Sequence, residues 1–472
     1  MNNIIKKIKS FTNSKYYDGI LDLLLCLGLL VQDIYKLVLF NTPFYKYVIV
    51  LIFVLLFIDF IINKRKIKLS LYYLLIIIVL YIYTFLLSYN KNIIVPAVFF
   101  LVEVITYILY IERIKEKEDF RKRLFNIIFF VATVLSAIGI IQVISYNLNI
   151  SFIYKNITQF VFYLDEGRLT SIYSEPAHLC TILGAGIFIS CYYLTLTNKF
   201  RYYLFLLLFL ITGLLSKSIV TYASIFGFVI LACYYIFRNY KKIKYSKKII
   251  SILLIIIAVS TGFVFFSSNS SYLSVITSKI TSLNEGKFGE NRQKSEKKSA
   301  SKDKEENNKK KSNTKTESNL TNQSNNMSAF AIKSNLNICI EKLKDKYYFG
   351  TGIFSHMNYY DKYMKRIYTG EYLRVNYTDA CSMFLRIFSE FGIVGFIIYL
   401  AMLIYLLIKS IIKNDIVLLT VLMLFITQSM RLGDYNWYLN CFTFVYLLFN
   451  VKPLCKHVIC IGGGSLCIKK EY

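Results

Sequence analysis

Twelve apolar stretches between Gly19 and Lys452, each long enough or nearly long enough to cross a bilayer, constrain the fold of this chain most strongly. Because no water satisfies backbone N–H and C=O groups inside hydrocarbon, such stretches must form helices. A hydrophobic fraction of 56% supports this interpretation. We therefore expect an all-α polytopic integral membrane protein with spans near residues 19–40, 44–62, 68–88, 92–111, 123–146, 176–196, 201–216, 218–237, 248–267, 390–409, 415–431 and 435–452.

Lysine and arginine are distributed unevenly between these stretches. The segments on one side of the predicted membrane, which include both termini, carry 28 of them, whereas the short segments on the other side carry seven. Cytoplasmic segments of membrane proteins are the basic ones, so we expect both termini to be cytoplasmic. The net charge of +28 then reflects topology and contact with anionic membrane lipid, and we expect no nucleic-acid partner.

A long hydrophilic segment separates the ninth and tenth predicted spans. It divides the chain into a cytoplasmic amino terminus (1–18), nine transmembrane helices (19–267), a large extracytoplasmic loop (268–389), three more transmembrane helices (390–452) and a cytoplasmic tail (453–472). Residues 284–328 are almost entirely Lys, Glu, Ser, Asn and Thr, a composition that cannot anchor a core, so we expect disorder there. Apolar residues return in 329–389, where we expect folded, amphipathic structure.

Tyrosines crowd together in this predicted folded part of the loop. Sugar rings stack on aromatic faces, so Tyr359 and Tyr360 are candidates for binding carbohydrate. An aromatic belt at the membrane interface would explain the same cluster. Cys339 and Cys381 share this loop, but sequence spacing alone does not establish a disulfide between them.

The strongest local signal for chemistry lies at the predicted outer start of the sixth span, in residues 168–178 (RLTSIYSEPAH). An arginine, a carboxylate and a histidine so close together at a bilayer surface are costly unless partnered or hydrated. Glu175 could be a functional carboxylate, or it could only form a structural salt bridge with Arg168. His178, three residues further on, could orient Glu175 or could be a buried, hydrogen-bonded residue.

Residues 168–179 (RLTSIYSEPAHL) resemble the R-x-x-S-x-F-x-E-P-S-x-L signature of bacterial O-antigen and capsule polymerases of the Wzy type, which share a superfamily with the O-antigen ligases. Three segments resemble further motifs of that family, in the same order: 214–230 (LLSKSIVTYASIFGFVI), 349–356 (FGTGIFSH) and 379–400 (DACSMFLRIFSEFGIVGFIIYL). The resemblance covers the carboxyl-terminal two thirds of the chain. It implies a GT-C-like glycosyltransferase of the bacterial cytoplasmic (inner) membrane, with about twelve transmembrane helices and a large extracytoplasmic loop between helices 9 and 10.

The implied reaction transfers a glycan from undecaprenyl pyrophosphate to a hydroxyl of a second lipid-linked repeat unit during synthesis of surface polysaccharide. A guanidinium holds two oxygens of a pyrophosphate leaving group in a fixed fork. Arg168 is therefore the first candidate for this role, with Arg374 or Arg386 as a second clamp. Lys217, at the predicted outer tip between two spans, could add positive potential.

The acceptor hydroxyl needs a base, for which Glu175 is the first candidate and His356 and Asp379 are the next. Glu390 could serve only as a cap of the tenth span. The external loops contain no D-x-D spacing, so we expect no divalent metal, and the resemblance likewise implies no metal or cofactor. The expected partners are the undecaprenyl-pyrophosphate-linked oligosaccharide, membrane lipid, a chain-length regulator and a flippase.

Two alternatives stay open. O-antigen ligases place a His-Asn pair just before the E-x-G-I-x-G segment, where this chain has Thr378 and Asp379, so the polymerase is favoured over the ligase. A flippase of lipid-linked oligosaccharide would be expected to show internal repeats and charged or broken helices at mid-membrane. We see no duplicated halves, and the acids in the apolar stretches fall near the ends of the predicted spans: Asp22, Asp33, Asp59 and Glu103.

Overall fold

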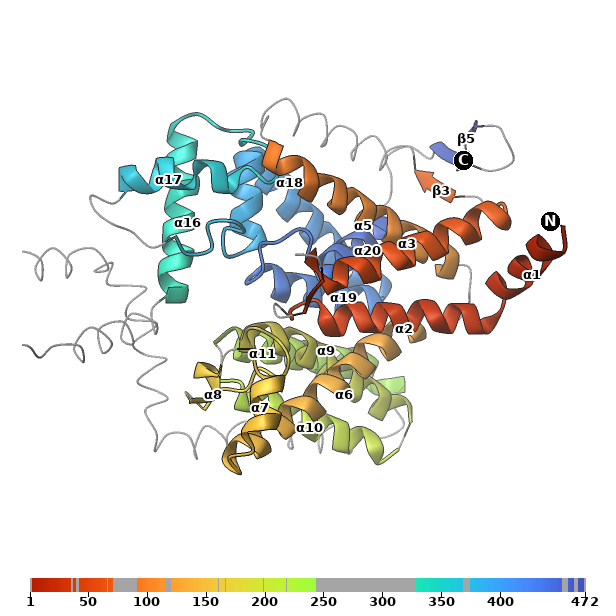
Figure 1. Ribbon diagram of the computed structural model, residues 1–472, viewed down its shortest axis with the longest axis horizontal. Coiled ribbons are helices and arrows are strands. Elements are labelled where there is room, and N and C mark those ends of the chain that lie inside the picture. Colours follow the sequence, from red (N-terminus) through yellow and green to blue (C-terminus); the bar gives the residue numbers. More distant parts are fainter. Residues whose placement is uncertain are drawn as a thin grey trace, which may run out of the picture. The chain divides into compact units, whose positions relative to one another are not determined.

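The computed structural model describes residues 2–34, 37–39, 42–65, 67–70, 91–115, 120–159, 161–165, 167–197, 199–217, 219–242, 327–367, 374–451, 457–461 and 466–470. These residues are mostly helical (Figure 1). The chain divides into two compact units. The first comprises Met1–Thr261 and Tyr399–Tyr472, and the second comprises Gly262–Ile398.

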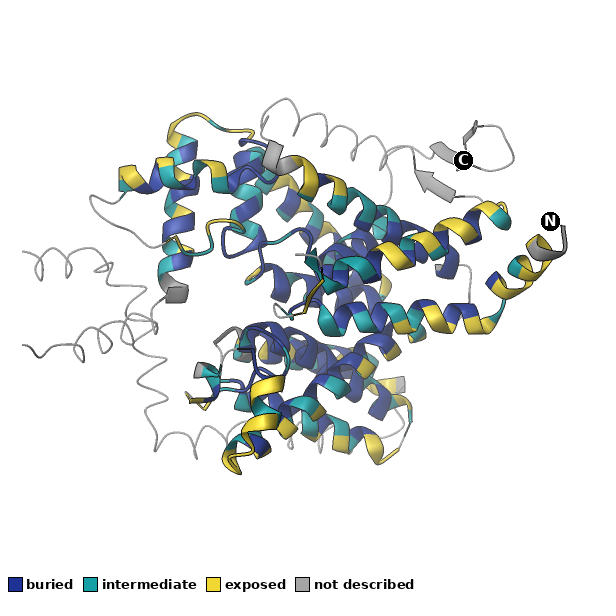
Figure 2. Ribbon diagram, viewed as in Figure 1, coloured by how far each residue is buried: buried dark blue, intermediate teal, exposed yellow. Residues whose placement is uncertain are grey.

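The first unit is a bundle of helices: α1 (Asn2–Thr12), α2 (Lys15–Val31), α3 (Phe44–Ile62), α5 (Lys91–Lys115), α6 (Phe120–Asn147), α7 (Ser151–Ile157), α8 (Phe162–Asp165), α9 (Pro176–Leu196), α10 (Arg201–Leu215), α11 (Ile219–Asn239), η1 (Tyr240–Lys242), α19 (Ile416–Ser429) and α20 (Tyr438–Asn450). Helix α9 lies at its centre, packed against α6, α10, α11 and α19. Almost every residue of α9 is buried (Figure 2), as expected for a helix that is apolar on all sides.

Six helices in the described part of the chain are long and apolar enough to cross a membrane: α3, α5, α6, α9, α11 and α18 (Met383–Lys413). Helices α10, α19 and α20 are apolar but shorter. The protein is therefore a helical membrane protein. Residues 71–88 of the predicted span 68–88 and the whole predicted span 248–267 lie outside the described residues, as do residues 284–326 of the segment predicted to be disordered.

Short strands accompany the helices. Helix α2 ends at Val31, well before the predicted end of the first span at residue 40, and β1 (Val38–Leu39) then pairs antiparallel with β2 (Thr42–Pro43). The side chains of the next two residues accept hydrogen bonds from distant backbone groups: Gln32 from Leu439 N–H and Asp33 from Ser174 N–H. A second antiparallel sheet has the order β3 (Ile67–Ser70), β4 (His457–Ile461) and β5 (Leu466–Lys470).

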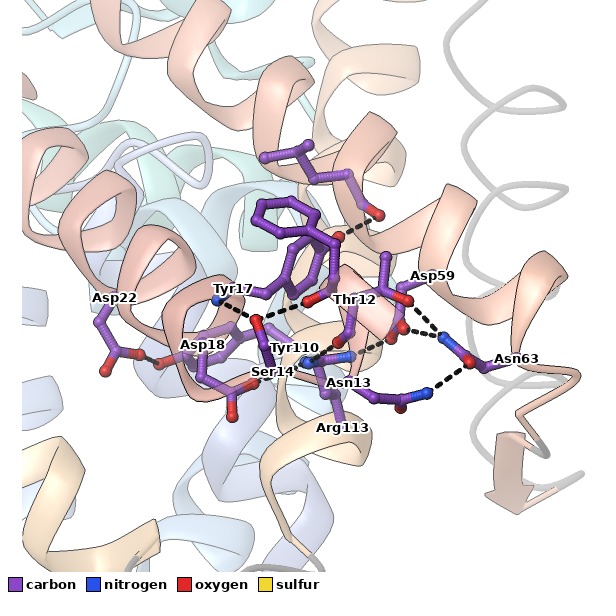
Figure 3. Close-up of polar contacts among 12 residues, drawn as sticks. Thr12, Asn13, Ser14, Tyr17, Asp18, Asp22, Asp59, Asn63, Tyr110 and Arg113 are labelled. Carbon is purple, nitrogen blue, oxygen red and sulfur yellow. Dashed lines mark hydrogen bonds and ion pairs between the residues drawn. The ribbon is translucent and has the colours of Figure 1, made fainter. Parts of the chain in front are cut away.

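A buried network of charges connects four helices of the first unit (Figure 3). Arg113 of α5 donates to Asp18 of α2 at 2.8 Å and to the carbonyl of Thr12, at the end of α1, at 2.6 Å. Arg113 also pairs with Asp59 of α3, which accepts from Arg65 at 2.7 Å. The side chains of Arg113, Asp18 and Asp59 are almost completely buried. Since buried charges are costly unless paired, this network holds α1, α2 and α3 against α5.

The second unit contains α16 (Met327–Lys344), α17 (His356–Ile367) and the first part of α18. Its core is formed by four fully buried side chains: Ile338, Tyr360, Tyr363 and Met364. Helix α16 begins at Met327, inside the segment predicted to be disordered. Helix α18 begins at Met383 and is interrupted at Gly392, whose φ is +66° and ψ is −169°, so the predicted span 390–409 falls on the part of α18 that follows this bend.

Candidate functional site

The loop that precedes α9, residues 168–175, is attached to neighbouring helices of the first unit through its backbone N–H groups. Gln142 of α6 accepts from the N–H of Ser171 at 2.8 Å. The N–H of Leu169 donates to the carbonyl of Leu215, at the end of α10, at 3.1 Å. The loop is therefore fixed against α6 and α10 at the end of the bundle where α9 begins.

Two of the predicted pyrophosphate-binding residues lie at the start of this loop: Arg168 is its first residue, and Lys217 is next to the preceding Gly167. Lys217 occupies the turn between α10 and α11 with a φ of +47°. Its Nζ lies only 3.1 Å from the point where a Cβ on Gly167 would stand. Arg168 follows Gly167 in the chain, and its guanidinium lies over the ring of Tyr163, 5.0 Å from the ring centre. The ammonium group of Lys217 therefore lies next to Gly167, the residue before Arg168.

Glu175 occupies the N-cap position of α9, but its side chain makes no capping hydrogen bond. Arg431, in the connection between α19 and α20, donates to Glu175 Oε2 from Nη2 at 2.9 Å and from Nε at 3.2 Å. His178 Nε2 lies 3.9 Å from the same oxygen. Glu175 is therefore held by an arginine far away in the sequence.

Asp33 holds the other side of the His178 ring. Its Oδ2 lies 2.9 Å from His178 Nδ1, and its two oxygens accept from the backbone N–H of Ser174 at 2.9 Å and from the Ser174 hydroxyl at 2.5 Å. Ser174 and Asp33 face the same ring nitrogen, whereas a serine nucleophile needs them on opposite nitrogens. The arrangement is therefore not a serine-hydrolase triad. We call the five residues the α9 polar cluster: Asp33, Ser174, Glu175, His178 and Arg431.

The electrostatics of the cluster keep Glu175 ionised. Burial by itself raises the pKa of the Glu175 carboxyl, but the guanidinium charges of Arg431 and Arg168, the hydrogen bond from Arg431 and the proximity of His178 outweigh it, so the pKa is lowered. The side chain remains 30% exposed. Glu175 is thus a carboxylate that a molecule from outside the bundle can reach.

In the second unit, two segments singled out in the sequence are joined through their backbones. The N–H groups of Thr351 and Gly352 both donate to the carbonyl of Glu390 at 2.9 Å. The N–H of Val394 donates to the carbonyl of Tyr348 at 3.2 Å. The turn before α17 is therefore attached directly to the bend of α18.

The side chain of Glu390 stabilises the same junction and does not cap a span. It is fully buried and accepts from Arg386 at 3.1 Å, from the N–H of Phe354 at 2.8 Å and from the N–H of His356 at 3.3 Å. Arg386, a predicted second clamp for pyrophosphate, has a side chain only 4% exposed. The structure therefore gives Arg386 an internal ion pair in place of an open binding position.

His356, a predicted base, is completely buried and uses both ring nitrogens. Nδ1 lies 2.8 Å from Ser389 Oγ, and Nε2 lies 2.8 Å from Asn335 Oδ1. Burial, together with the charges of Lys342 and Arg386, holds the pKa of His356 well below its usual range. A neutral imidazole with both nitrogens occupied positions its neighbours, so the structure supports a packing role for His356.

The other predicted site residues of the second unit have local partners. Asp379 accepts from Asn376 Nδ2 at 3.1 Å and from the N–H of Cys381 at 3.3 Å, which closes a turn. Arg374 forms an exposed ion pair with Asp361 at 2.5 Å. Each side chain is thus explained by local structure.

The two candidate sugar-binding tyrosines differ in exposure. Tyr360 is fully buried in the core of the second unit, so it offers no ring face to a sugar, contrary to the prediction. Tyr359 packs against that core, with Lys342 Nζ 4.7 Å from its ring centre. Cys339 and Cys381 are both buried and are not joined to each other, so the disulfide left open by the sequence does not form.

Lys342 makes the stability of the second unit dependent on pH. Its ammonium donates to Ser389 Oγ at 2.7 Å and to Thr351 Oγ1 at 3.0 Å, and burial lowers its pKa from 10.5 to about 8. Between these values the unfolded chain binds more protons than the folded one, so stability should rise with pH, by up to ~3 kcal/mol. Proteolysis of the second unit during thermal unfolding at pH values across this window would measure the rise. Lys342→Met should abolish the difference, and an equal slope in this variant would contradict the assignment.

Sequence reasoning missed two members of the α9 polar cluster, Asp33 and Arg431. An acid at the end of an apolar stretch and an arginine on the same predicted side as Arg168 were the available signals.

Comparisons with protein-family models, with curated proteins and with solved structures found no match.

Proposed function

We propose that this protein is a polymerase of surface polysaccharide, which transfers a growing glycan from undecaprenyl pyrophosphate to a hydroxyl of another lipid-linked repeat unit. The α9 polar cluster carries the proposal, because it holds an ionised, reachable carboxylate against a guanidinium. Two further cations, Arg168 and Lys217, lie at the loop that leads into it. A pyrophosphate leaving group needs cations, and an attacking hydroxyl needs a base.

The proposal includes a topology for the whole chain. About twelve helices span the bacterial cytoplasmic membrane, both termini are cytoplasmic, and the segment that contains the second unit is extracytoplasmic. The fourfold bias of lysine and arginine toward one set of segments supports this orientation. The start of α9 then lies at the outer surface, where a lipid-linked glycan is held with its pyrophosphate at the membrane face.

In the proposed reaction, Arg168 and Lys217 bind the pyrophosphate, and Arg431 fixes Glu175. The acceptor hydroxyl attacks the anomeric carbon of the donor glycan, and its proton passes to the Glu175 carboxylate. The bond from that carbon to the phosphate oxygen breaks, and its electron pair leaves with undecaprenyl pyrophosphate. The product is a longer glycan on the acceptor lipid.

The test is complementation of a strain from which the gene has been deleted, with the surface glycan separated on a gel. Wild type should restore long chains, and Glu175→Gln and Arg431→Ala should lower chain extension by roughly 10²- to 10⁴-fold. Arg431→Lys keeps the positive charge but loses the two-point contact of the guanidinium with Glu175. Its chain extension should therefore be greater than that of Glu175→Gln and Arg431→Ala and less than that of wild type. Arg201→Ala, which removes an arginine outside the cluster, is the control and should extend chains normally. Immunoblots of the membrane fraction would show that each variant is inserted.

The glycan left in the deletion strain separates the three functions. Single repeats attached to the usual acceptor would support a polymerase. Long chains retained on undecaprenyl pyrophosphate would instead show a ligase, and repeat units retained on the cytoplasmic side would show a flippase. Normal polymer from both Glu175→Gln and Arg431→Ala would exclude the site.

A further inference from the structure

The α9 polar cluster contains a histidine between two carboxylates, which the proposed reaction has not yet used. His178 Nδ1 lies 2.9 Å from Asp33, and Nε2 lies 3.9 Å from Glu175. The ring also meets Trp437 edge to face, with centres 5.1 Å apart. The position of the ring is therefore constrained, and its two nitrogens lie near two different acids.

The hydrogen bonds of Asp33 assign the tautomer of His178. Oδ1 accepts from the Ser174 hydroxyl, and Oδ2 accepts from the Ser174 backbone N–H. Ser174 thus supplies two donors to one carboxylate, whose remaining acceptor capacity faces His178 Nδ1. A carboxylate in this position orients an imidazole with its proton on Nδ1. The lone pair of Nε2 then faces Glu175.

We propose that His178 and Asp33 form a proton-accepting dyad behind Glu175. This inference rests on the proposed function and adds the destination of the proton. Glu175 takes the proton from the acceptor hydroxyl as the glycosidic bond forms, and His178 Nε2 then takes that proton from Glu175. Asp33 is a positioning residue, because it acts through the imidazole and does not touch the substrate.

The step balances in protons and charge. One proton leaves the hydroxyl, passes through Glu175 and ends on His178, which becomes an imidazolium paired with the Asp33 carboxylate. Glu175 returns to the ionised form that Arg431 binds. The electron pair of the broken bond gives undecaprenyl pyrophosphate one more negative charge, which balances the positive charge gained by His178, and no oxidant, reductant or metal takes part.

Three charged groups face His178 from the elements packed around it. Asp33 comes from the turn after α2, Glu175 from the loop before α9, and Arg431 from the connection between α19 and α20. His178 itself is 6% exposed. Because the ring is shielded from bulk water, its proton exchange runs through Glu175, which is the more exposed member of the pair.

Membranes from the deletion strain would supply the host's own lipid-linked repeat unit, and purified protein would be added to them. Initial rates of chain extension would be measured between about pH 5 and 9, a range that brackets an ordinary histidine. Wild type should show an acid limb, because an already protonated imidazole cannot accept a proton. His178→Gln should lose that limb and extend chains at least ~10²-fold more slowly at neutral pH.

Asp33→Asn should reduce the rate of chain extension by a similar factor, because it disturbs the tautomer of His178. The amount of bound repeat unit should be unchanged, because the cations that bind pyrophosphate, Arg168 and Lys217, are intact. Tyr173→Phe is the matched control. It removes a buried hydroxyl that donates to Leu29 of α2 at 2.7 Å, so it perturbs the same packing without touching the dyad. Its rate and acid limb should equal those of wild type.

The outcomes separate the two proposals. If wild type makes no polymer from these membranes, the proposed function fails. If wild type extends chains and both His178→Gln and Asp33→Asn keep its rate and its acid limb, the dyad is wrong while the function stands. A limb that persists in His178→Gln would assign the titration to another group and would equally overturn the dyad.

Discussion

Arg113→Ala is expected to destabilise the first unit by roughly 3–5 kcal/mol, because it leaves two buried carboxylates without their shared partner. Arg113 is the group through which Asp18 and Asp59 are joined, and it also binds the last carbonyl of α1. Asp59 keeps Arg65, whereas Asp18 depends mainly on Arg113 for charge compensation at close range. The substitution would therefore remove the residue that connects Thr12, Asp18 and Asp59 in Figure 3.

Thermal unfolding of the detergent-solubilised protein would measure this loss. Arg238→Ala is the control, because Arg238 is exposed and donates to the hydroxyl of Tyr234, a contact worth at most about 1 kcal/mol. Combining Arg113→Met with Asp18→Asn and Asp59→Asn should recover much of the stability, since no uncompensated charge stays buried. If Arg113→Ala unfolds at the same temperature as Arg238→Ala, the network does not hold the helices together.

Gly350→Ala and Gly392→Ala are expected to disrupt the second unit, each by about 3 kcal/mol or more. Both glycines have positive φ, +81° and +66°, a conformation that costs other residues energy. A Cβ on Gly350 would stand 2.2 Å from the carbonyl oxygen of Glu390, and one on Gly392 would stand 2.1 Å from that of Tyr348. Since both obstacles are backbone atoms, a rotamer change cannot relieve the clash.

Limited proteolysis of the full-length protein would report the effect, because the junction between the turn and the bend of α18 should open to cleavage. Gly19→Ala is the matched control: nothing lies within 4 Å of its added Cβ, and alanine suits the helix interior. That variant should be unchanged or slightly more stable. Protease resistance of Gly350→Ala and Gly392→Ala equal to that of Gly19→Ala would show that the junction tolerates a side chain.

The helices of this protein could be predicted well where a segment is uniformly apolar. The predicted spans 44–62 and 176–196 coincide with α3 and α9, because membrane insertion depends on local composition and Pro176 suits the first helical turn. Prediction was less successful at the end of α2, near Asp33, whose side chain binds Ser174 far away in the sequence, and at Gly392, where α18 bends.

The candidate site shows the same division. Composition and local spacing were enough to indicate a helical membrane protein and to single out Arg168 and Glu175, because hydrophobicity and unusual polar residues can be read one segment at a time. The partners of Glu175 and His178 were decided by tertiary structure. Arg431 lies 256 positions from Glu175, and Asp33 lies 145 positions from His178. Those pairs exist only because α2, α9 and the connection between α19 and α20 converge, and no local property of the chain encodes which distant side chains the packed helices bring within hydrogen-bond distance.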